Sequence, residues 1–186
     1  FIKKTIKSCI EQNFMAKEII VYDDCSTDNS LEILEKFKQI KILKNKKKKF
    51  LSSPLNQIHG IIELFKKSKG DIIFLLDGDD QFKKKKISEI FRMFKKDKKL
   101  NFIQDKPFLG DKKKFMFLKK KNHLFSIWPS FYPTSCMALR RDFFKKFLRY
   151  IEKNKFPNLE IDARLSMYAY LKKEFFFTNK SFTIYN

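Results

Sequence analysis

The chain has 186 residues, of which 43% are hydrophobic and 16% aromatic, which is enough for one domain with a substantial core and excludes a disordered tail. Its net charge of +21 (42 Lys+Arg against 21 Asp+Glu) would normally point to nucleic acid or an anionic membrane. A compositional bias toward Lys, Phe, Ile and Asn favours a solvated basic surface instead, with membrane attraction next and nucleic-acid binding last. No apolar run is long enough to span a membrane, and three separated cysteines without nearby histidines exclude a zinc site.

The first half of the chain alternates between helical and strand patterns. Apolar residues at helical spacing predict a helix from Phe1 to about Gln12, and the run EIIVY at 18–22 predicts a buried strand. The elements expected next are helix 28–39, strand 40–43, helix 55–67, strand 71–76, helix 84–96 and strand 101–104. A basic run, Lys46 to Lys49, lies between the second strand and its helix.

The second half is less regular because three prolines and a glycine interrupt residues 105–133. We expect a loop region there with one short strand at 115–118. A strand at 134–139, a helix at 142–153, a helix from Pro157 to about Lys172 and a strand at 175–177 follow. Strands that alternate with helices through short connections predict an α/β fold with a mostly parallel sheet, formed as a single domain over 1–186.

Acidic residues follow two of the predicted strands. Asp23 and Asp24 come after the first strand, and the sequence DGDD at 77–80 comes after the third. Ligands of open α/β sheets bind at the carboxyl ends of the strands, and neighbouring carboxylates repel one another unless a cation or a donor-rich ligand is present. Each cluster also has a structural interpretation, since Asp23 and Asp24 suit a helix cap and DGDD suits a turn.

The spacing Asp-x-Asp after an apolar strand fits a nucleotide-phosphate site. Mg²⁺ and Mn²⁺ prefer oxygen ligands, and a diphosphate completes a shell to which the protein gives one or two carboxylates. Asp79 is the first candidate for the metal, and Asp77 for ribose hydroxyls or for a metal bound through water. Asp24 suits the imide N–H of a uracil-like base.

Four segments together resemble the family 2 glycosyltransferases, which have the GT-A fold. They are EIIVYDDCSTDNS at 18–30, GDIIFLLDGDDQF at 70–82, PTSCMALRRDFF at 133–144 and EIDARL at 160–165. The resemblance implies an inverting glycosyltransferase that uses a divalent metal and a nucleoside-diphosphate sugar. It also implies a nucleotide-sugar half at 1–104 and an acceptor and catalytic half at 105–186. The family's first strand, which lines the nucleotide, would precede Phe1, so we expect an N-terminally truncated domain.

The resemblance assigns roles to particular acids. It implies that Asp23 and Asp24 bind the nucleotide base, that Asp77 binds the ribose and that Asp79 binds the metal, Mg²⁺ or Mn²⁺. Asp162 becomes the catalytic base. The family's usual Glu before that acid is replaced by Ile161, which makes Glu160 a rival, and an acid favoured by the start of a helix is the structural alternative.

The remaining candidate residues and partners have less support from motifs. Trp128 is a candidate platform for a sugar or acceptor, with burial in the core as the alternative. Arg140 and Arg141 are candidates for contacts to the diphosphate or a phosphorylated acceptor, with a structural role beside the next helix as the alternative. The resemblance implies a UDP-sugar donor, a glycan or lipid-linked acceptor for cell-envelope polysaccharide, and a cytoplasmic place, peripheral to the inner membrane face.

Two other classes of protein account for part of the pattern. A receiver-like signalling domain also has acids after its strands, but here the second cluster holds three acids and the chain continues too far. A basic module for nucleic acid or membranes matches the net charge but leaves the acidic strand ends unexplained. Nucleic acid is therefore not an expected partner.

Overall fold

The computed structural model describes residues 1–118, 129–151 and 156–186. The helices are α1 (Ile2–Ile10), α2 (Ser30–Glu35), α3 (Ser53–Lys67), α4 (Lys86–Lys96), α5 (Arg141–Leu148) and α6 (Ile161–Leu171), with a 3₁₀ turn η1 (Thr134–Cys136). The strands are β1 (Ile20–Asp23), β2 (Lys41–Lys44), β3 (Ile72–Phe74), β4 (Gln81–Phe82), β5 (Phe102–Leu109), β6 (Lys114–Phe115), β7 (Met137–Arg140) and β8 (Phe175–Tyr185).

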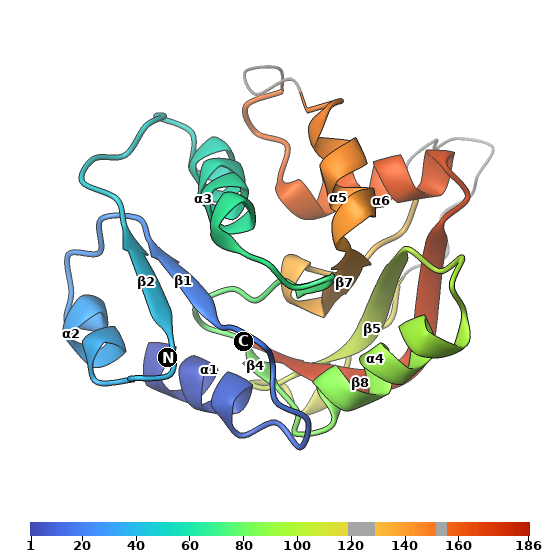
Figure 1. Cartoon of the computed structure of the whole chain (residues 1–186), viewed down its shortest axis with the longest axis horizontal. Coiled ribbons are helices and arrows are strands. Elements are labelled where there is room, and N and C mark those ends of the chain that lie inside the picture. Colours follow the sequence, from blue (N-terminus) through green and yellow to red (C-terminus); the bar gives the residue numbers. More distant parts are fainter. Residues whose placement is uncertain (119–128, 152–155) are drawn as a thin grey trace.

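The strands form two sheets (Figure 1). β1 and β2 are a parallel pair, and the other six strands make one sheet in the order β3-β7-β5-β8-β4, with β6 paired to β5. Helices α3, α5 and α6 lie above the strands in this view, and α1 and α4 lie below. The predicted α/β class is confirmed.

The pairing within the larger sheet differs from the predicted mostly parallel arrangement. Only β5 and β8 run parallel there, whereas β3–β7, β7–β5, β5–β6 and β8–β4 are antiparallel. The segment between β6 and β7 is interrupted by prolines, and an antiparallel neighbour needs no crossover helix. β7 therefore enters between β3 and β5 against their direction.

The pleat of β5 and β7 divides the core between the two faces of the sheet. Phe102 packs with the buried faces of α3, α5 and α6, whereas the next residue, Ile103, packs with Ile90 and Phe94 of α4. Successive strand side chains point to opposite faces, so apolar residues follow one another where both faces are covered. No helix in the described ranges has the length and apolar character needed to cross a bilayer.

Helix α3 lies unusually close to β1. A Cβ added at Gly60 would come within 2.7 Å of the Tyr22 ring, so only glycine permits this approach. Ser52 caps the helix by accepting from the N–H of Leu55. The helix therefore starts at a fixed place, and its first two turns reach the pocket described below.

Strand β8 is the largest departure from the predicted elements, because a strand was expected only at 175–177. Its pairing with β5 shifts register between Asp105 and Pro107. The β8 residues opposite this shift are polar, and for that reason the sequence there has the pattern of a loop. The N–H of Phe182 donates to the buried carboxylate of Asp105 at this irregularity. The continuation carries β8 on to Tyr185.

Candidate functional site

A pocket of about 370 Å³ opens where the first turns of α3 and α6 meet the end of β3. Its lining residues are Ser53, Pro54, Gln57, Asp77, Pro133, Thr134, Glu160, Asp162 and Tyr185. Three of these are carboxylic acids, and none of the lining residues in the described ranges is Lys, Arg or His. Such a pocket attracts a cation or a ligand with many hydrogen-bond donors.

Asp77 is held from two sides. Its main-chain N–H donates to Ser135 Oγ at 2.9 Å, and its Oδ1 accepts from Gln57 Nε2 at 3.1 Å. Burial raises the pKa of Asp77 to about 6, opposed by the Gln57 bond and assisted by repulsion from Asp80, Asp79 and Asp162. The sequence placed Asp77 at a strand end, and the structure directs it into the pocket.

The rest of the DGDD turn is fastened by the end of β8. The N–H of Asn186 donates to Asp80 Oδ1 at 2.9 Å, and Asn186 Nδ2 donates to the carbonyl of Asp79 at 2.7 Å. Asp80 is fully buried, and burial raises its pKa. Its Oδ2 has no hydrogen-bond partner among the described residues, while the side chain of Asp79 is exposed.

Asp162 faces the same pocket from the first turn of α6. Its Oδ1 accepts the N–H of Ala163 at 2.6 Å, as expected for an acid at a helix start. Burial raises its pKa to about 6, with further repulsion from Glu160. Glu160 is the N-cap residue of α6 and also lines the pocket, but it is exposed.

The first acidic pair lies at the carboxyl end of β1 and is not part of the pocket lining. Asn45, just after β2, joins the two strand ends there. Its side-chain amide donates to Asp24 Oδ1 at 2.8 Å, and its N–H donates to the carbonyl of Asp23 at 2.9 Å. The structure therefore brings Asp77 and Asp162 together at one pocket and leaves Asp23 and Asp24 in a separate cluster with Asn45.

Arg140 at the end of β7 and Arg141 at the start of α5 are not part of the pocket lining. Arg140 donates to the carbonyls of Phe94 and Leu100, and Arg141 donates to the carbonyl of Gly70, before β3 begins. Asp77 follows the opposite end of that strand. These bonds support the structural alternative for both arginines, and Trp128 lies outside the described residues.

The acidic turn fits a divalent cation as a partial site. Among the described residues, no three His, Cys, Asp or Glu side chains are gathered as a complete set of metal ligands. A nucleotide-bound Mg²⁺ or Mn²⁺ needs only one or two protein carboxylates. The exposed carboxylate of Asp79 offers an oxygen ligand of the kind that such an ion prefers, and the neighbouring Asp80 has a buried oxygen without a hydrogen-bond partner among the described residues.

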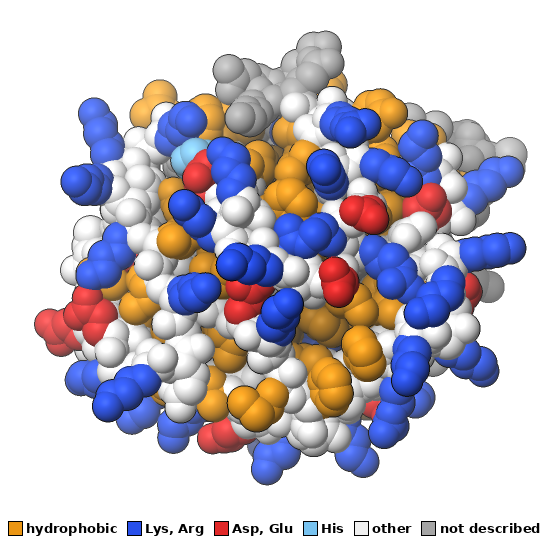
Figure 2. All heavy atoms as spheres, in the orientation of Figure 1, with side chains coloured by type: hydrophobic (Ala, Val, Ile, Leu, Met, Phe, Trp, Pro, Cys, Tyr) orange, Lys and Arg blue, Asp and Glu red, His pale blue; other side chains and the backbone are white. Residues whose placement is uncertain are grey.

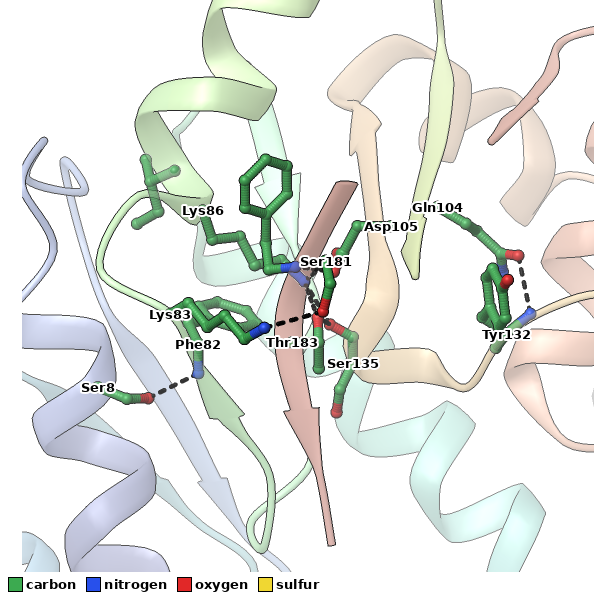
Figure 3. A network of polar contacts seen from close by, with 12 residues as sticks. Ser8, Phe82, Lys83, Lys86, Gln104, Asp105, Tyr132, Ser135, Ser181 and Thr183 are labelled. Carbon is green, nitrogen blue, oxygen red and sulfur yellow. Dashed lines mark hydrogen bonds and ion pairs between the residues drawn. The ribbon is translucent and has the colours of Figure 1, made fainter. Parts of the chain in front are cut away.

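A buried polar network around Lys86 reaches Ser135, which also bonds Asp77 (Figure 3). The ammonium group of Lys86 is fully buried and donates to Asp105 Oδ1 at 2.7 Å, Thr183 Oγ1 at 2.7 Å and the carbonyl of Ser135 at 2.6 Å. The same Ser135 accepts the N–H of Asp77 through its hydroxyl. The network thus joins α4, β5 and β8 to the residue that orients Asp77.

Sequence reasoning missed Gln57, Ser135, Tyr185, Asn186 and Lys86. Only Lys86 carried a detectable signal, because it recurs at helical spacing with the buried Ile90 and Phe94 and so belongs to the apolar face of α4. The others reach the site through long-range contacts that no local pattern encodes.

The family model described as Glycosyl transferase family 2 matches residues 1–148. A protein of Haemophilus influenzae, described as an uncharacterized glycosyltransferase, is 32% identical over 105 residues, which cover 55% of this chain and 37% of that protein. This chain thus spans well under half of that relative.

Solved structures of glycosyltransferases share the fold. S. aureus TarS superimposes with a TM-score of 0.72 at 17% identity, over 99% of this chain and 56% of that one. TarS in complex with UDP-GlcNAc gives a TM-score of 0.69 at 16% identity, over 100% and 54% of the two chains. The Pyrobaculum calidifontis mannosyltransferase PcManGT, solved with GDP-Man and Mn²⁺, gives 0.64 at 12% identity, over 96% and 50%. At these identities the likeness establishes the GT-A-like fold.

Proposed function

The chain belongs to glycosyl transferase family 2, and from this premise we propose that it moves a sugar from a nucleoside-diphosphate sugar to an acceptor hydroxyl with inversion at the anomeric carbon. The observation that carries the proposal is the pairing of Asp77 and Asp162 at one acidic pocket, from the end of β3 and the start of α6. Residues 1–104 and 105–186, the proposed donor and acceptor halves, both contribute to that pocket.

The donor is proposed to bind along the acidic strand ends. Asp77 accepts hydrogen bonds from ribose hydroxyls, Asp79 holds Mg²⁺ or Mn²⁺, and Asp23 and Asp24 bind the base. A bound divalent cation offsets negative charge on the leaving diphosphate. A UDP-sugar is the favoured donor, because the carboxylate of Asp24 suits the imide N–H of uracil. TarS, which has a related fold, was solved in complex with UDP-GlcNAc, which also supports this donor.

Asp162 is proposed as the general base. As the acceptor oxygen forms its bond to the anomeric carbon, the bond from that carbon to the diphosphate oxygen breaks, and the acceptor proton passes to the Asp162 carboxylate. A carboxyl group whose pKa is about 6 is ionised at neutral pH and remains basic enough to take that proton. Glu160 is exposed at the rim of the pocket, which favours Asp162 over this rival.

The acceptor is proposed to be a glycan or a lipid-linked precursor of a cell-envelope polysaccharide. The charge of +21 suits an enzyme that works in the cytoplasm beside the anionic inner face of the membrane.

Calorimetric titration of the chain with UDP, with and without Mn²⁺, tests the donor site. UDP is expected to bind only with the metal present, and Asp79→Ala is expected to weaken that binding by at least about 10- to 100-fold. Asp71→Ala is a matched control, because Asp71 is an exposed acid at the other end of the same strand. UDP binding without metal, or unchanged binding in Asp79→Ala, would contradict the proposal.

A further inference from the structure

Two exposed apolar side chains flank the mouth of the pocket. Leu51 is fully exposed and Phe156 is 68% exposed. They lie on segments 105 residues apart that are joined directly beside them, because Ser52 Oγ donates to the carbonyl of Pro157. Ser53, directly after Ser52, and Glu160, three residues after Pro157, both line the pocket.

Both segments are held in place. Arg164 donates to the carbonyls of Phe156 at 2.7 Å and Leu159 at 2.9 Å, and the N–H of Leu159 donates to the carbonyl of Phe156. Ser52 also caps α3. These bonds fix the backbone beside both apolar side chains and keep those side chains at the surface.

A run of four exposed lysines, Lys46 to Lys49, precedes Leu51 in the same loop. Figure 2 shows basic side chains together with apolar ones at the upper left, over the loop between β2 and α3. Clusters of four or more lysines beside apolar groups bind membranes with anionic lipids, and each lysine contributes about a fivefold gain in partitioning.

Some other exposed aromatic residues have a face already covered. The ammonium group of Lys106 lies 3.6 Å above the Phe117 ring, and Phe14 stacks on Phe91 with 5.1 Å between ring centroids. Among the described residues, no ring or cation stacks on Phe156. Leu51 and Phe156 therefore expose apolar surface, and the four exposed lysines at 46–49 precede Leu51 in the same loop.

We propose that Leu51, Phe156 and Lys46–Lys49 form a membrane rim that rests on a bilayer containing anionic lipids and turns the pocket mouth toward it. The two apolar side chains enter the interfacial region and the lysines bind lipid headgroups. The pocket's role rests on the proposed function, but attachment of the rim to a membrane does not require donor binding. An acceptor carried in the membrane would reach the pocket without leaving the lipid surface.

Sedimentation of the 186-residue chain with vesicles tests the membrane rim. We expect binding to phosphatidylcholine vesicles that contain phosphatidylglycerol and little binding to pure phosphatidylcholine. Leu51→Ser combined with Phe156→Ser is expected to lower partitioning by at least about tenfold, and Gln at all four positions Lys46–Lys49 by about 100- to 1000-fold. Unchanged melting curves and unchanged UDP binding in these variants separate this test from that of the donor site.

Two control variants match the test variants in chemistry. Met15→Ser removes an apolar side chain that is 80% exposed but away from the pocket, and Gln at Lys95, Lys96, Lys98 and Lys99 removes four exposed charges from the end of α4 and the turn after it. Equal losses in test and control variants mean non-specific attraction and overturn the proposal. A loss caused instead by Phe117→Ser, or binding of an RNA oligonucleotide that the rim lysines alone control, overturns it as well.

Discussion

Asp77 and Asp162 each have a pKa raised to about 6 by burial, so the pocket keeps two carboxyl groups that ionise near neutral pH. For Asp162 the groups that face it are acids, Glu160 on its own helix and Asp77 across the pocket. Its pKa is higher in the folded chain than its ordinary value of 3.8, so the folded state binds this proton more tightly than the unfolded state. Ionisation of Asp162 above pH 6 therefore costs folding free energy, and the cost vanishes below the unfolded pKa.

Asp162→Asn is expected to separate catalysis from stability. Sugar transfer should fall by at least about 100-fold because the proposed base is lost, whereas UDP binding stays unchanged. At pH 7 the free energy of unfolding of the variant should be higher than that of the wild type by about 1–2 kcal/mol, after allowance for solvent in the open pocket. At pH 3 the two proteins should be equally stable. Chemical denaturation at the two pH values measures this, and a variant less stable at pH 7 contradicts the burial argument.

The elements around the pocket are joined by the Lys86 network as well as by strand pairing. Lys86 brings a helix, two strands and the 3₁₀ turn to one ammonium group, and Asp105 receives the N–H of Phe182 where the register of β8 shifts. A buried charge pair of this kind specifies an arrangement of elements, because a partner left alone is costly.

Lys86→Met is expected to lower the free energy of unfolding by about 3–5 kcal/mol, since it leaves Asp105 as an uncompensated buried charge. The double variant Lys86→Met with Asp105→Asn should recover part of that loss. Urea denaturation provides the measurement, and Lys85→Met, at an exposed neighbouring lysine, should change stability by less than about 0.5 kcal/mol. Equal losses of stability in Lys85→Met and Lys86→Met would show that the buried pair of Lys86 and Asp105 does not stabilise the fold.

Local patterns predicted the positions of helices and strands better than they predicted which strands pair with one another. The run DIIFLL and the helix over 84–96 were recognised because burial on one or both faces leaves a direct trace in the order of apolar residues. The direction of β7, the second part of β8 and the two-residue strand β4 left no such trace, since they depend on contacts with distant segments. In the site, Asp77 and Asp162 were found from motifs, whereas Ser135, which orients Asp77, lies 58 residues away from it.

The charge of the whole chain acts on its stability as well as on its partners. A net charge of +21 implies self-repulsion in the compact state, and basic side chains are spread over the face shown in Figure 2. Salt screens such repulsion within about 10 Å at 0.1 M. This repulsion therefore destabilises the folded chain most at low ionic strength.

Raising NaCl from about 0.02 to 0.3 M is expected to increase the melting temperature by several degrees, at about 2–4 °C for each kcal/mol of relieved repulsion. The variant with Gln at Lys95, Lys96, Lys98 and Lys99 lowers the charge from +21 to 21 − 4 = +17 and should respond less. Scanning calorimetry over the salt series measures both proteins, and a melting temperature that falls with salt contradicts the argument.

Asn186 fastens the acidic turn from a position 106 residues after Asp80. On a ribosome the acids at 77–80 emerge long before this amide, and Tyr185, the last lining residue of the pocket, emerges just ahead of it. A nascent chain stalled anywhere before β8 therefore lacks one wall of the pocket and the fastening of the acidic turn. The pocket is complete only after residues 185 and 186 have been made, so a ligand bound there cannot guide the folding of the earlier elements.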